Sequence, residues 1–264
     1  MYKLRRHRQL SQNFLRGRIL VKQLVRNSSI GPNDLVLEIG PGEGIITQEL
    51  LTIAKNVIAV EVDSRFYHFI TRKFVHCRNL TVYHADTLKI KLPSVPYKVF
   101  ANIPFSIEGR LIRRLLHCPN PPQDSYLVVR RSLAERLGGI YQEGLFSVLH
   151  KPFFNFEIVH RFRPNDFFPA TFVRPVLLRI TKTEKSLIFP HQISAYRRFI
   201  TRGFSGGRRL NQNLRPFFTP AELNRAASRL GFSPNSPPSS LTFPQWLGLF
   251  SIWSHRAPGI DYRD

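Results

Sequence analysis

The chain is poor in cysteine and has no long apolar run. Its 264 residues include two cysteines, Cys77 and Cys118, whose spacing matches no zinc or redox motif. The nine histidines form no H-E-x-x-H or Cys/His array. No apolar run reaches the ~20 residues that a membrane span needs. We therefore expect a cytoplasmic protein with reduced thiols, without a metal site and without a membrane segment.

Acidic residues are also scarce, at 17 against 39 basic ones, of which 29 are arginine. The net charge is +22, and it gathers at the two ends: residues 1–30 carry eight basic residues and no acidic one. Arginine grips phosphates with a planar fork and stacks on bases, so the imbalance indicates a nucleic-acid partner. A basic membrane anchor is disfavoured because no lipidation signal accompanies the charge. An arginine-rich mitochondrial presequence is disfavoured because a functional motif begins only a few residues later.

Short apolar runs alternate with amphipathic stretches through the first two thirds of the chain. Strands are expected at 35–39, 57–61, 80–83, 97–101 and 125–129, and helices at 45–54, 64–75, 106–117 and around Leu133. Ser64 is expected to cap the second of these helices. The alternation predicts an α/β fold, in which βαβ units build a parallel sheet covered on both faces.

The pattern changes towards the end of the chain. Residues 154–162 and 173–181 resemble two strands that we expect to be antiparallel neighbours, since little room for a helix separates them. Short amphipathic helices are expected at 192–202, 220–230 and 243–253. We therefore predict a catalytic domain at 1–183, including the basic N-terminal segment, and a small all-helical RNA-binding domain at 184–264.

A glycine-rich turn and two acids follow three successive predicted strands. The turn is Glu38-Ile39-Gly40-Pro41-Gly42-Glu43-Gly44, and Glu61 and Asp86 follow the next two strands. Glycines allow a sharp turn and close approach of a ligand, and a carboxylate can accept bonds from both hydroxyls of a ribose. The G-x-G-x-G spacing differs from that of dinucleotide sites, which disfavours NAD. Together these elements resemble class I (Rossmann-like) methyltransferases that use S-adenosylmethionine.

The segment Asn102-Ile103-Pro104-Phe105 follows the fourth predicted strand and would stand in the next position around the same site. An exocyclic adenine nitrogen is a poor nucleophile because its lone pair is delocalised into the ring. The oxygen of Asn102 and a nearby main-chain carbonyl could accept its two N–H bonds and aim the lone pair at a methyl donor. Proline stiffens the turn, and Phe105 could stack on the base.

Three segments together resemble the ribosomal RNA adenine N6-dimethyltransferase family. They are Arg5-Arg6-x-x-x-Leu10-Ser11-Gln12-Asn13-Phe14-Leu15, the glycine turn, and Asn102 to Phe105. A fourth segment, 167–180, resembles a further motif of that family, with Thr171 and Pro175 as departures. The resemblance implies that S-adenosylmethionine is contacted by Asn13, Leu15, Gly40, Gly42, Glu61, Asp86 and Asn102.

Within this family, Ile103 and Phe105 resemble the Erm branch, as does the segment 245–250 near the end. That resemblance implies N6-methylation, single or double, of an adenosine in the peptidyl-transferase loop of 23S rRNA. It also implies resistance to macrolides, lincosamides and streptogramin B, with a monomeric enzyme acting before the ribosome is fully assembled. Two alternatives stay open: a small-subunit rRNA dimethyltransferase, and a non-catalytic nucleic-acid-binding factor on the same fold.

Three groups of arginines are candidates for RNA contacts, because the target adenine must be swung out of folded RNA to reach Asn102. They are Arg5, Arg6, Arg8, Arg16 and Arg18 at the start, Arg110, Arg113 and Arg114 after the catalytic motif, and Arg208, Arg209 and Arg215 in the helical region.

Overall fold

The structure, a computed structural model, describes residues 13–255. It divides into two compact units. The first joins the residues up to Ala134 with Glu157–Lys182, and the second joins Glu135–Phe156 with the residues from Thr183 onward. The predicted domains were continuous, with a boundary after residue 183. In the structure, residues 135–156 belong to the same unit as the C-terminal helices. This association joins segments that are distant in sequence, so no local sequence pattern predicts it.

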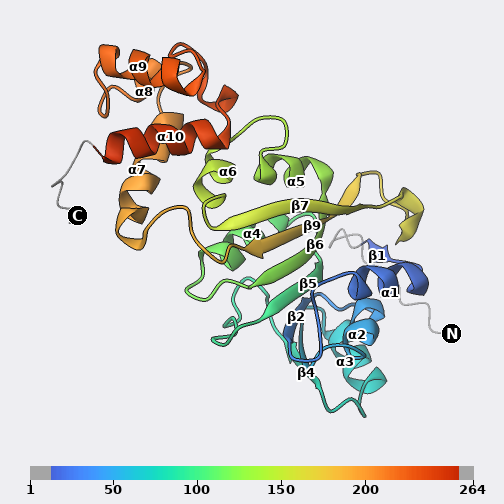
Figure 1. The fold of residues 1–264 in the computed structure, drawn as a ribbon. Coiled ribbons are helices and arrows are strands. Elements are labelled where there is room, and N and C mark those ends of the chain that lie inside the picture. Colours follow the sequence, from blue (N-terminus) through green and yellow to red (C-terminus); the bar gives the residue numbers. More distant parts are fainter. Residues whose placement is uncertain (1–12, 256–264) are drawn as a thin grey trace. The chain divides into compact units, whose positions relative to one another are not determined.

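A seven-stranded sheet runs in the order β4-β3-β2-β5-β6-β9-β7 (Figure 1). Its strands are β2 (Leu35–Ile39), β3 (Asn56–Glu61), β4 (Leu80–His84), β5 (Lys98–Asn102), β6 (Asp124–Arg130), β7 (Phe154–Arg161) and β9 (Pro175–Lys182). The first five pair in parallel, and β9 runs antiparallel to β6. The five predicted parallel strands and the adjacency of the two late strands are confirmed.

Five helices and a two-stranded ribbon accompany this sheet. The helices are α1 (Arg18–Arg26), α2 (Ile45–Leu50), α3 (Ser64–Lys73), α4 (Glu108–His117) and α5 (Arg131–Gly138). The ribbon pairs β1 (Phe14–Leu15) with β8 (Phe167–Phe168) in antiparallel register, and a short 3-10 helix, Pro164–Asp166, precedes β8. The ribbon ties the start of the described chain to a segment about 150 residues away in sequence.

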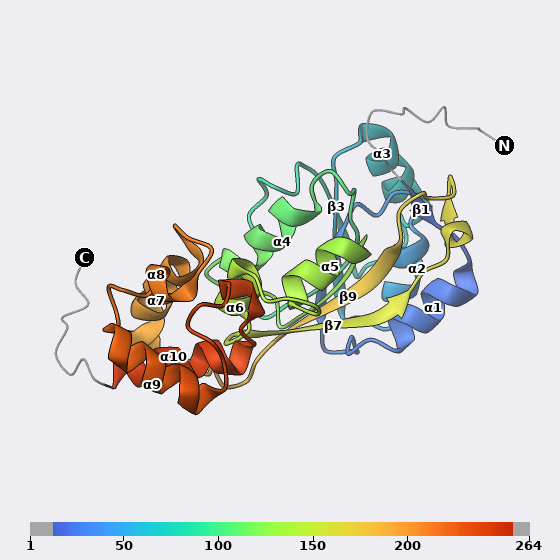
Figure 2. The same cartoon turned by 90° about the horizontal axis from the view of Figure 1, so that it is seen from above.

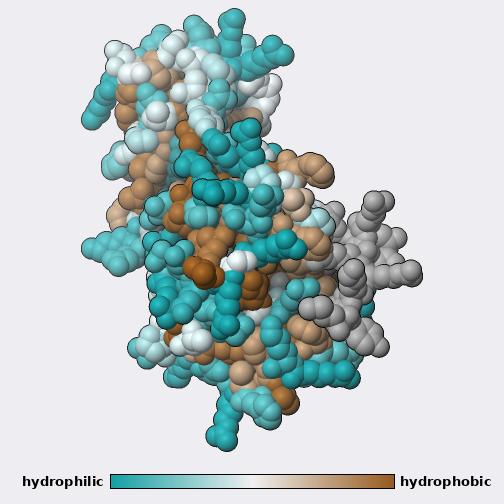
Figure 3. All heavy atoms as spheres, turned by 90° about the vertical axis from the view of Figure 1, so that its right-hand side faces the viewer, coloured by the Kyte–Doolittle hydropathy of each residue, from teal (hydrophilic) through white to brown (hydrophobic). Residues whose placement is uncertain are grey.

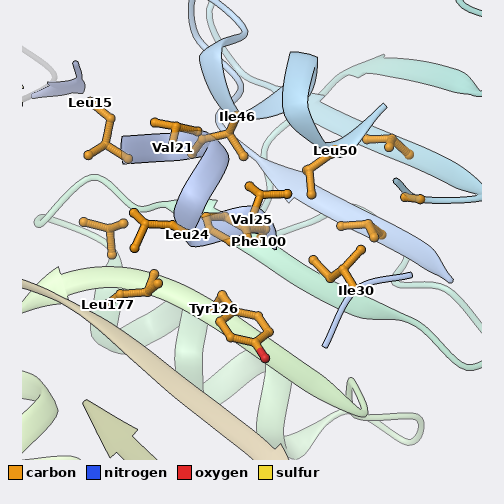
Figure 4. Close-up of a cluster of buried hydrophobic side chains, with 14 of the residues drawn as sticks. Leu15, Val21, Leu24, Val25, Ile30, Ile46, Leu50, Phe100, Tyr126 and Leu177 are labelled. Carbon is orange, nitrogen blue, oxygen red and sulfur yellow. The ribbon is translucent and has the colours of Figure 1, made fainter. Parts of the chain in front are cut away.

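Side chains from both faces of the sheet are buried. On one face, α1 and α2 pack over Phe100, Tyr126 and Leu177, as Figure 4 shows. The Phe100 and Tyr126 rings stack with centroids 5.8 Å apart. Val99, which alternates with Phe100 along β5 and so points to the opposite face, is 0% exposed. Burial on both faces explains the continuous apolar runs of the parallel strands.

The start of α3 differs from the expectation by one residue. Ser64 was expected to cap the helix, but Asp63 occupies the N-cap position, and its side chain accepts a hydrogen bond from the main-chain N–H of Arg65. Ser64 is instead the first helical residue. Aspartate and serine are both good N-cap residues, so sequence alone could not decide between neighbours.

The second unit is helical. It contains α6 (Leu145–His150), α7 (Ile193–Phe204), α8 (Leu210–Asn213), α9 (Pro220–Leu230) and α10 (Phe243–Ser254), with 3-10 turns at Pro190–Gln192 and Pro238–Ser240 (Figure 2). The three predicted helices are confirmed. Thr219 with Glu222, and Thr242 with Gln245, form reciprocal capping boxes, and proline follows as the first residue of α9 and the second residue of α10. These caps satisfy main-chain donors that would otherwise lack partners and so define where both helices begin.

Aromatic side chains fill the core of this unit. The ring of Phe199 packs against the rings of Trp246, Phe250 and Trp253. Phe199, Trp246 and Phe250 are each at most 2% exposed. The indole N–H of Trp246 donates to the carbonyl of Pro238 at 3.2 Å, so its one polar group is satisfied.

Hydrophilic residues cover most of the face drawn in Figure 3, with hydrophobic ones gathered in patches between them. Within residues 13–255, no helix combines the length and apolar character that crossing a bilayer requires.

Candidate active site

A pocket opens where β2, β3 and β5 end. Because parallel strands present their carboxyl ends at one edge of the sheet, the loops that follow them meet there. The pocket is lined by Asn13, Phe14, Gly40, Gly42, Glu61, Asn102, Ile103, Pro104 and Phe105. It therefore brings together the predicted glycine turn, one of the two predicted acids and the whole predicted catalytic motif.

The glycine turn depends on the absence of side chains at its centre. Gly42 has φ +54°, a conformation that other residues rarely adopt. A Cβ atom there would lie 2.7 Å from Cε1 of Phe14, closer than any ordinary contact. The turn is thus closed on one side by the Phe14 ring, which itself packs 5.3 Å from the ring of Phe66.

Glu61 is held by the main chain at the end of β3 and is 2% exposed. Its Oε1 accepts from the main-chain N–H groups of Val62 and Asp63, each at 2.9 Å, and Oε2 accepts from Gly42 at 3.2 Å. Burial raises the pKa of Glu61, and these three N–H donors oppose the rise. These bonds fix the carboxyl in place against the glycine turn, where Glu61 forms part of the pocket lining.

Glu38, in β2 just before the turn, is a second buried acid. It is 1% exposed, and neither carboxyl oxygen has a hydrogen-bond partner among residues 13–255. Burial raises the pKa of Glu38 to about 8, although the side chain and main chain of nearby Thr47 oppose the rise; the charge of Glu61 adds a smaller increase. Burial therefore favours the neutral form of Glu38 more than that of an ordinary carboxyl group.

Asn102 is oriented by a hydrogen bond across the pocket. Its Nδ2 donates to the main-chain carbonyl of Asn13 at 2.8 Å, and the side chain of Asn13 donates to the carbonyl of Pro169 at 2.9 Å. Because Nδ2 must face a carbonyl, the other end of the amide, Oδ1, remains as an acceptor. The site thus presents an acceptor oxygen whose direction is set by a segment 89 residues away.

The rest of the catalytic motif is anchored below the pocket. Ile103 is 2% exposed and Phe105 is half-buried, and both residues line the pocket. The helix that follows is held by Glu108, whose carboxylate accepts from the side chain and the main-chain N–H of Arg130 at 2.5 and 3.1 Å. The turn therefore contributes one buried aliphatic side chain and one half-buried aromatic ring to the pocket lining.

Two of the predicted cofactor residues lie outside the pocket lining. The Leu15 side chain is 5% exposed and packs in the core, so any contact it makes with a ligand would come from its main chain. Asp86 is half-buried beyond β4, and its Oδ1 accepts from the N–H of Leu88 at 2.9 Å.

Phe14, by contrast, lines the pocket although no role was predicted for it. The sequence did hold one indication of such a role, because Phe14 lies between Asn13 and Leu15 in the N-terminal segment that resembles the family.

The candidate RNA-contacting arginines have varied surroundings. Arg5, Arg6 and Arg8 lie outside the described residues. Arg18 pairs with Glu49 at 3.3 Å but is 70% exposed, and the Arg16 guanidinium lies 3.9 Å over the Phe168 ring. The side chains of Arg110, Arg113, Arg208, Arg209 and Arg215 are exposed. Arg114 differs, because it is half-buried and donates to the carbonyl of Ile90.

Within residues 13–255, no group of three or more His, Cys, Asp or Glu side chains is placed to hold a metal ion. The two cysteines are half-buried and unpaired with each other.

Comparison with known proteins gives a consistent result. A family model described as ribosomal RNA adenine dimethylase matches residues 3–254. The rRNA adenine N-6-methyltransferase of Bacillus anthracis is 27% identical over 259 residues, covering 96% of this chain and 90% of that protein. Ribosomal RNA small subunit methyltransferase A of Nostoc punctiforme is 31% identical over 236 residues, 82% of each. Among solved structures, the 23S rRNA methyltransferase ErmE superposes with a TM-score of 0.86 at 25% identity, covering 92% of this chain and 100% of that one.

Proposed function

This chain belongs to the ribosomal RNA adenine dimethylase family, and on that basis we propose that it methylates N6 of an adenosine in the peptidyl-transferase loop of 23S rRNA. Membership establishes the coarser activity: the protein is an rRNA adenine N6-methyltransferase of the class I fold that uses S-adenosylmethionine. The finer proposal is an Erm-type enzyme that confers resistance to macrolides, lincosamides and streptogramin B. We further propose that it acts as a monomer, before the ribosome is fully assembled.

The observation that carries the 23S proposal is the likeness to ErmE along the whole of that chain. The residues Ile103 and Phe105 of the catalytic motif, both part of the pocket lining, support the same branch. The small-subunit enzyme of Nostoc punctiforme keeps small-subunit rRNA as the second candidate substrate. The named relatives are methyltransferases, so a non-catalytic factor loses its support.

The pocket fits S-adenosylmethionine. Gly40 and Gly42 leave its wall free of side chains, and the Oε2 atom of Glu61 retains a lone pair for a ribose hydroxyl. Asn13 and Phe14 would cover the cofactor from the side of β1, the main chain of Leu15 would add a contact, and Asp86 would accept from the adenine amino group. When bound, the cofactor supplies a methyl group on a positively charged sulfur, which makes that methyl electrophilic.

Asn102 would act on the geometry of the nucleophile. Its Oδ1 accepts one N–H of the target N6 amino group, and a neighbouring main-chain carbonyl of the Asn102–Pro104 turn accepts the other. This arrangement draws the nitrogen towards a pyramidal shape and turns its lone pair to the methyl group. With N6 oriented in this way, the bound cofactor would supply its methyl group to the nitrogen lone pair and would leave as the demethylated thioether, and the methylated nitrogen would then give up a proton to water.

Phe105, at the mouth of the pocket, would stack on the extruded adenine, while buried Ile103 and rigid Pro104 keep the turn in place. The three arginine groups named above would hold phosphates, including Arg5, Arg6 and Arg8 in the part that the structure leaves undescribed. Phosphate contacts position the RNA and supply much of its affinity.

Methyl transfer to matched RNA fragments tests the proposal. Tritiated S-adenosylmethionine is supplied with a peptidyl-transferase-loop fragment of 23S rRNA or with a small-subunit rRNA fragment of equal length. We expect label in the 23S fragment, and none when its target adenosine is replaced by guanosine. Label confined to the small-subunit fragment would overturn the Erm assignment and establish the second candidate.

A further inference from the structure

A second pocket lies in the first unit, at the opposite end of α4 from the catalytic motif. The catalytic turn precedes the first residue of α4, whereas this pocket is formed by residues 91–94 and 117–120 together with Arg114. Since a helix rises 1.5 Å per residue, the ten residues of α4 separate the two sites by about 15 Å.

The lining of this pocket combines positive charge with flat apolar surface. Lys91, Arg114 and His117 bring basic groups, and Leu92, Pro93 and Pro119 bring apolar ones. None of the described residues that line it is acidic. A ligand with an anionic group joined to a flat apolar ring, as in a nucleotide, complements both parts of this surface.

Arg114 gives a second, independent indication of an anion. Its Nη2 donates to the carbonyl of Ile90, but its Nε is buried and has no hydrogen-bond partner among residues 13–255. A guanidinium group with a buried, unsatisfied N–H is costly to desolvate. An anion in the pocket would offset part of that cost through attraction to the charge of the guanidinium group, without a hydrogen bond to the buried Nε.

Hydrogen bonds between the two lining loops hold the walls of this pocket in place. The side chain of Asn120 donates to the carbonyls of Pro93 and Val95 at 3.0 and 2.8 Å, which fastens the two lining loops together. Cys118 lies against the carbonyls of Leu115 and Asn120 at 3.1 and 3.2 Å. The pocket is therefore already formed without a ligand.

Exposed basic residues join the two sites along α4. Arg110, Arg113 and His117 are exposed, and with half-buried Arg114 they follow the i, i+3, i+4, i+7 spacing of one helix face. This face forms a basic ridge that starts next to the catalytic motif and ends at the pocket. A polyanion bound at the catalytic end would thus be led towards the pocket.

We propose that this pocket is a second nucleotide-binding site, which takes one unpaired nucleotide of the rRNA about four to five positions from the target adenosine. The count follows from ~15 Å of helix at the ~3.4 Å spacing of stacked bases. The phosphate lies against Lys91, Arg114 and His117, and the base lies on the proline surface. The proposal rests on the enzyme's rRNA substrate, whichever ribosomal subunit supplies it.

Binding to long and short RNA fragments tests the site. The long fragment extends ten nucleotides to either side of the target adenosine, and two short fragments stop three nucleotides from it on one side or the other. For the wild-type protein we expect one of the short fragments to bind about tenfold more weakly than the long one, as loss of one stacked base predicts.

Two variants remove the site in different ways. Lys91→Glu reverses a charge in the pocket, and Ser94→Trp fills it from an exposed position without changing charge. Each should abolish the difference between long and short fragments. Lys55→Glu, exposed in the loop before β3, is the control with the same change in net charge, and it should keep the difference.

A 4-thiouridine placed four or five nucleotides from the target should also photo-crosslink to peptides that contain residues 91–94 or 117–120. The proposal is overturned if both pocket variants keep the full length dependence, or if they weaken long and short fragments equally. Binding is measured without methyl transfer, so failure of the 23S assignment, which the transfer assay decides, is a separate result.

Discussion

The two units of this protein differ in what they bury. The sheet-containing unit buries five carboxylic acids, Glu38, Glu49, Glu61, Glu108 and Asp124, each at most 5% exposed. In the described part of the helical unit, Glu143 is the one buried acid, at 8% exposure, and the core consists of aromatic rings.

Buried carboxyl groups stabilise the first unit through directional hydrogen bonds, whereas aromatic packing stabilises the second unit without strong directionality. A buried carboxyl must be hydrogen-bonded or neutral, so it fixes the atoms around it. Asp124 accepts from Arg179 at 2.7 Å and from Ser29 at 2.7 Å, and Glu61 accepts from three main-chain donors. Aromatic packing tolerates small shifts more easily. Positional precision is therefore concentrated in the unit that holds the predicted catalytic motif.

The largest effect should follow from Asn102→Ala in the first unit. Loss of the oriented Oδ1 acceptor should lower kcat by about 100-fold or more, since misplacing a reacting group has costs of that size. Tritiated methyl transfer measures the loss. Phe105→Tyr, which keeps the aromatic face, is the matched variant and should retain activity. Comparable kcat for Asn102→Ala and the wild type would remove Asn102 from catalysis.

In the second unit, Trp246→Ala should affect stability instead of the site. Trp246 is 0% exposed, and truncating a buried tryptophan typically costs about 3–5 kcal/mol. Both tryptophans of the chain lie in α10, so the fluorescence of the remaining Trp253 follows this unit alone in denaturant. Trp246→Phe should recover part of the loss. The affinity for S-adenosylmethionine, measured by calorimetry, should be unchanged. A large loss of affinity would show that the packing of the second unit also affects the cofactor pocket of the first.

A smaller effect is expected for Glu61→Ala. Removing the carboxylate leaves the main-chain donors of Gly42, Val62 and Asp63 without their acceptor and deprives the ribose of its partner. We expect S-adenosylmethionine binding to weaken by about 1–3 kcal/mol. Glu61→Gln, which keeps one oxygen, should lose less. Equal calorimetric affinity for all three proteins would exclude the ribose role.

A different kind of effect is expected from Glu38, a dependence of stability on pH. Burial raises its pKa from 4.5 to about 8 in the folded protein. Below pH 4.5 the acid is protonated in both states, and between pH 4.5 and 8 only the unfolded chain ionises, so stability falls across that window and levels off above it. The Tm advantage of Glu38→Gln over the wild type, without cofactor, should therefore grow from pH 5 to pH 8. A difference that is constant with pH would contradict the raised pKa.

Local signals in the sequence were sufficient where structure depends on near neighbours. The strand 35–39 and the helix 220–230 match their predicted bounds, because apolar periodicity and a Thr-Pro-Ala-Glu start are short-range features. The order of the glycine turn, Glu61 and Asn102 along successive strands was also enough to predict one shared site. Parallel strands must bring their carboxyl ends to the same edge.

Other features arose only from contacts between distant segments. The Phe14 ring closes the glycine turn, residues 135–156 join the helical unit, and Arg114 is half-buried beside a second pocket.

Sequence patterns were enough to predict the alternation of strands and helices, the glycine turn and a candidate catalytic motif at residues 102–105. Contacts in the folded chain were needed to show that Asn102 points its Nδ2 at Asn13, that burial raises the pKa of Glu38, and that α4 ends at a basic pocket. Sequence patterns predict helices, strands and turns because backbone conformation follows mainly from neighbouring residues. The partners, burial and pKa of a polar atom depend on whichever remote segments fold against it.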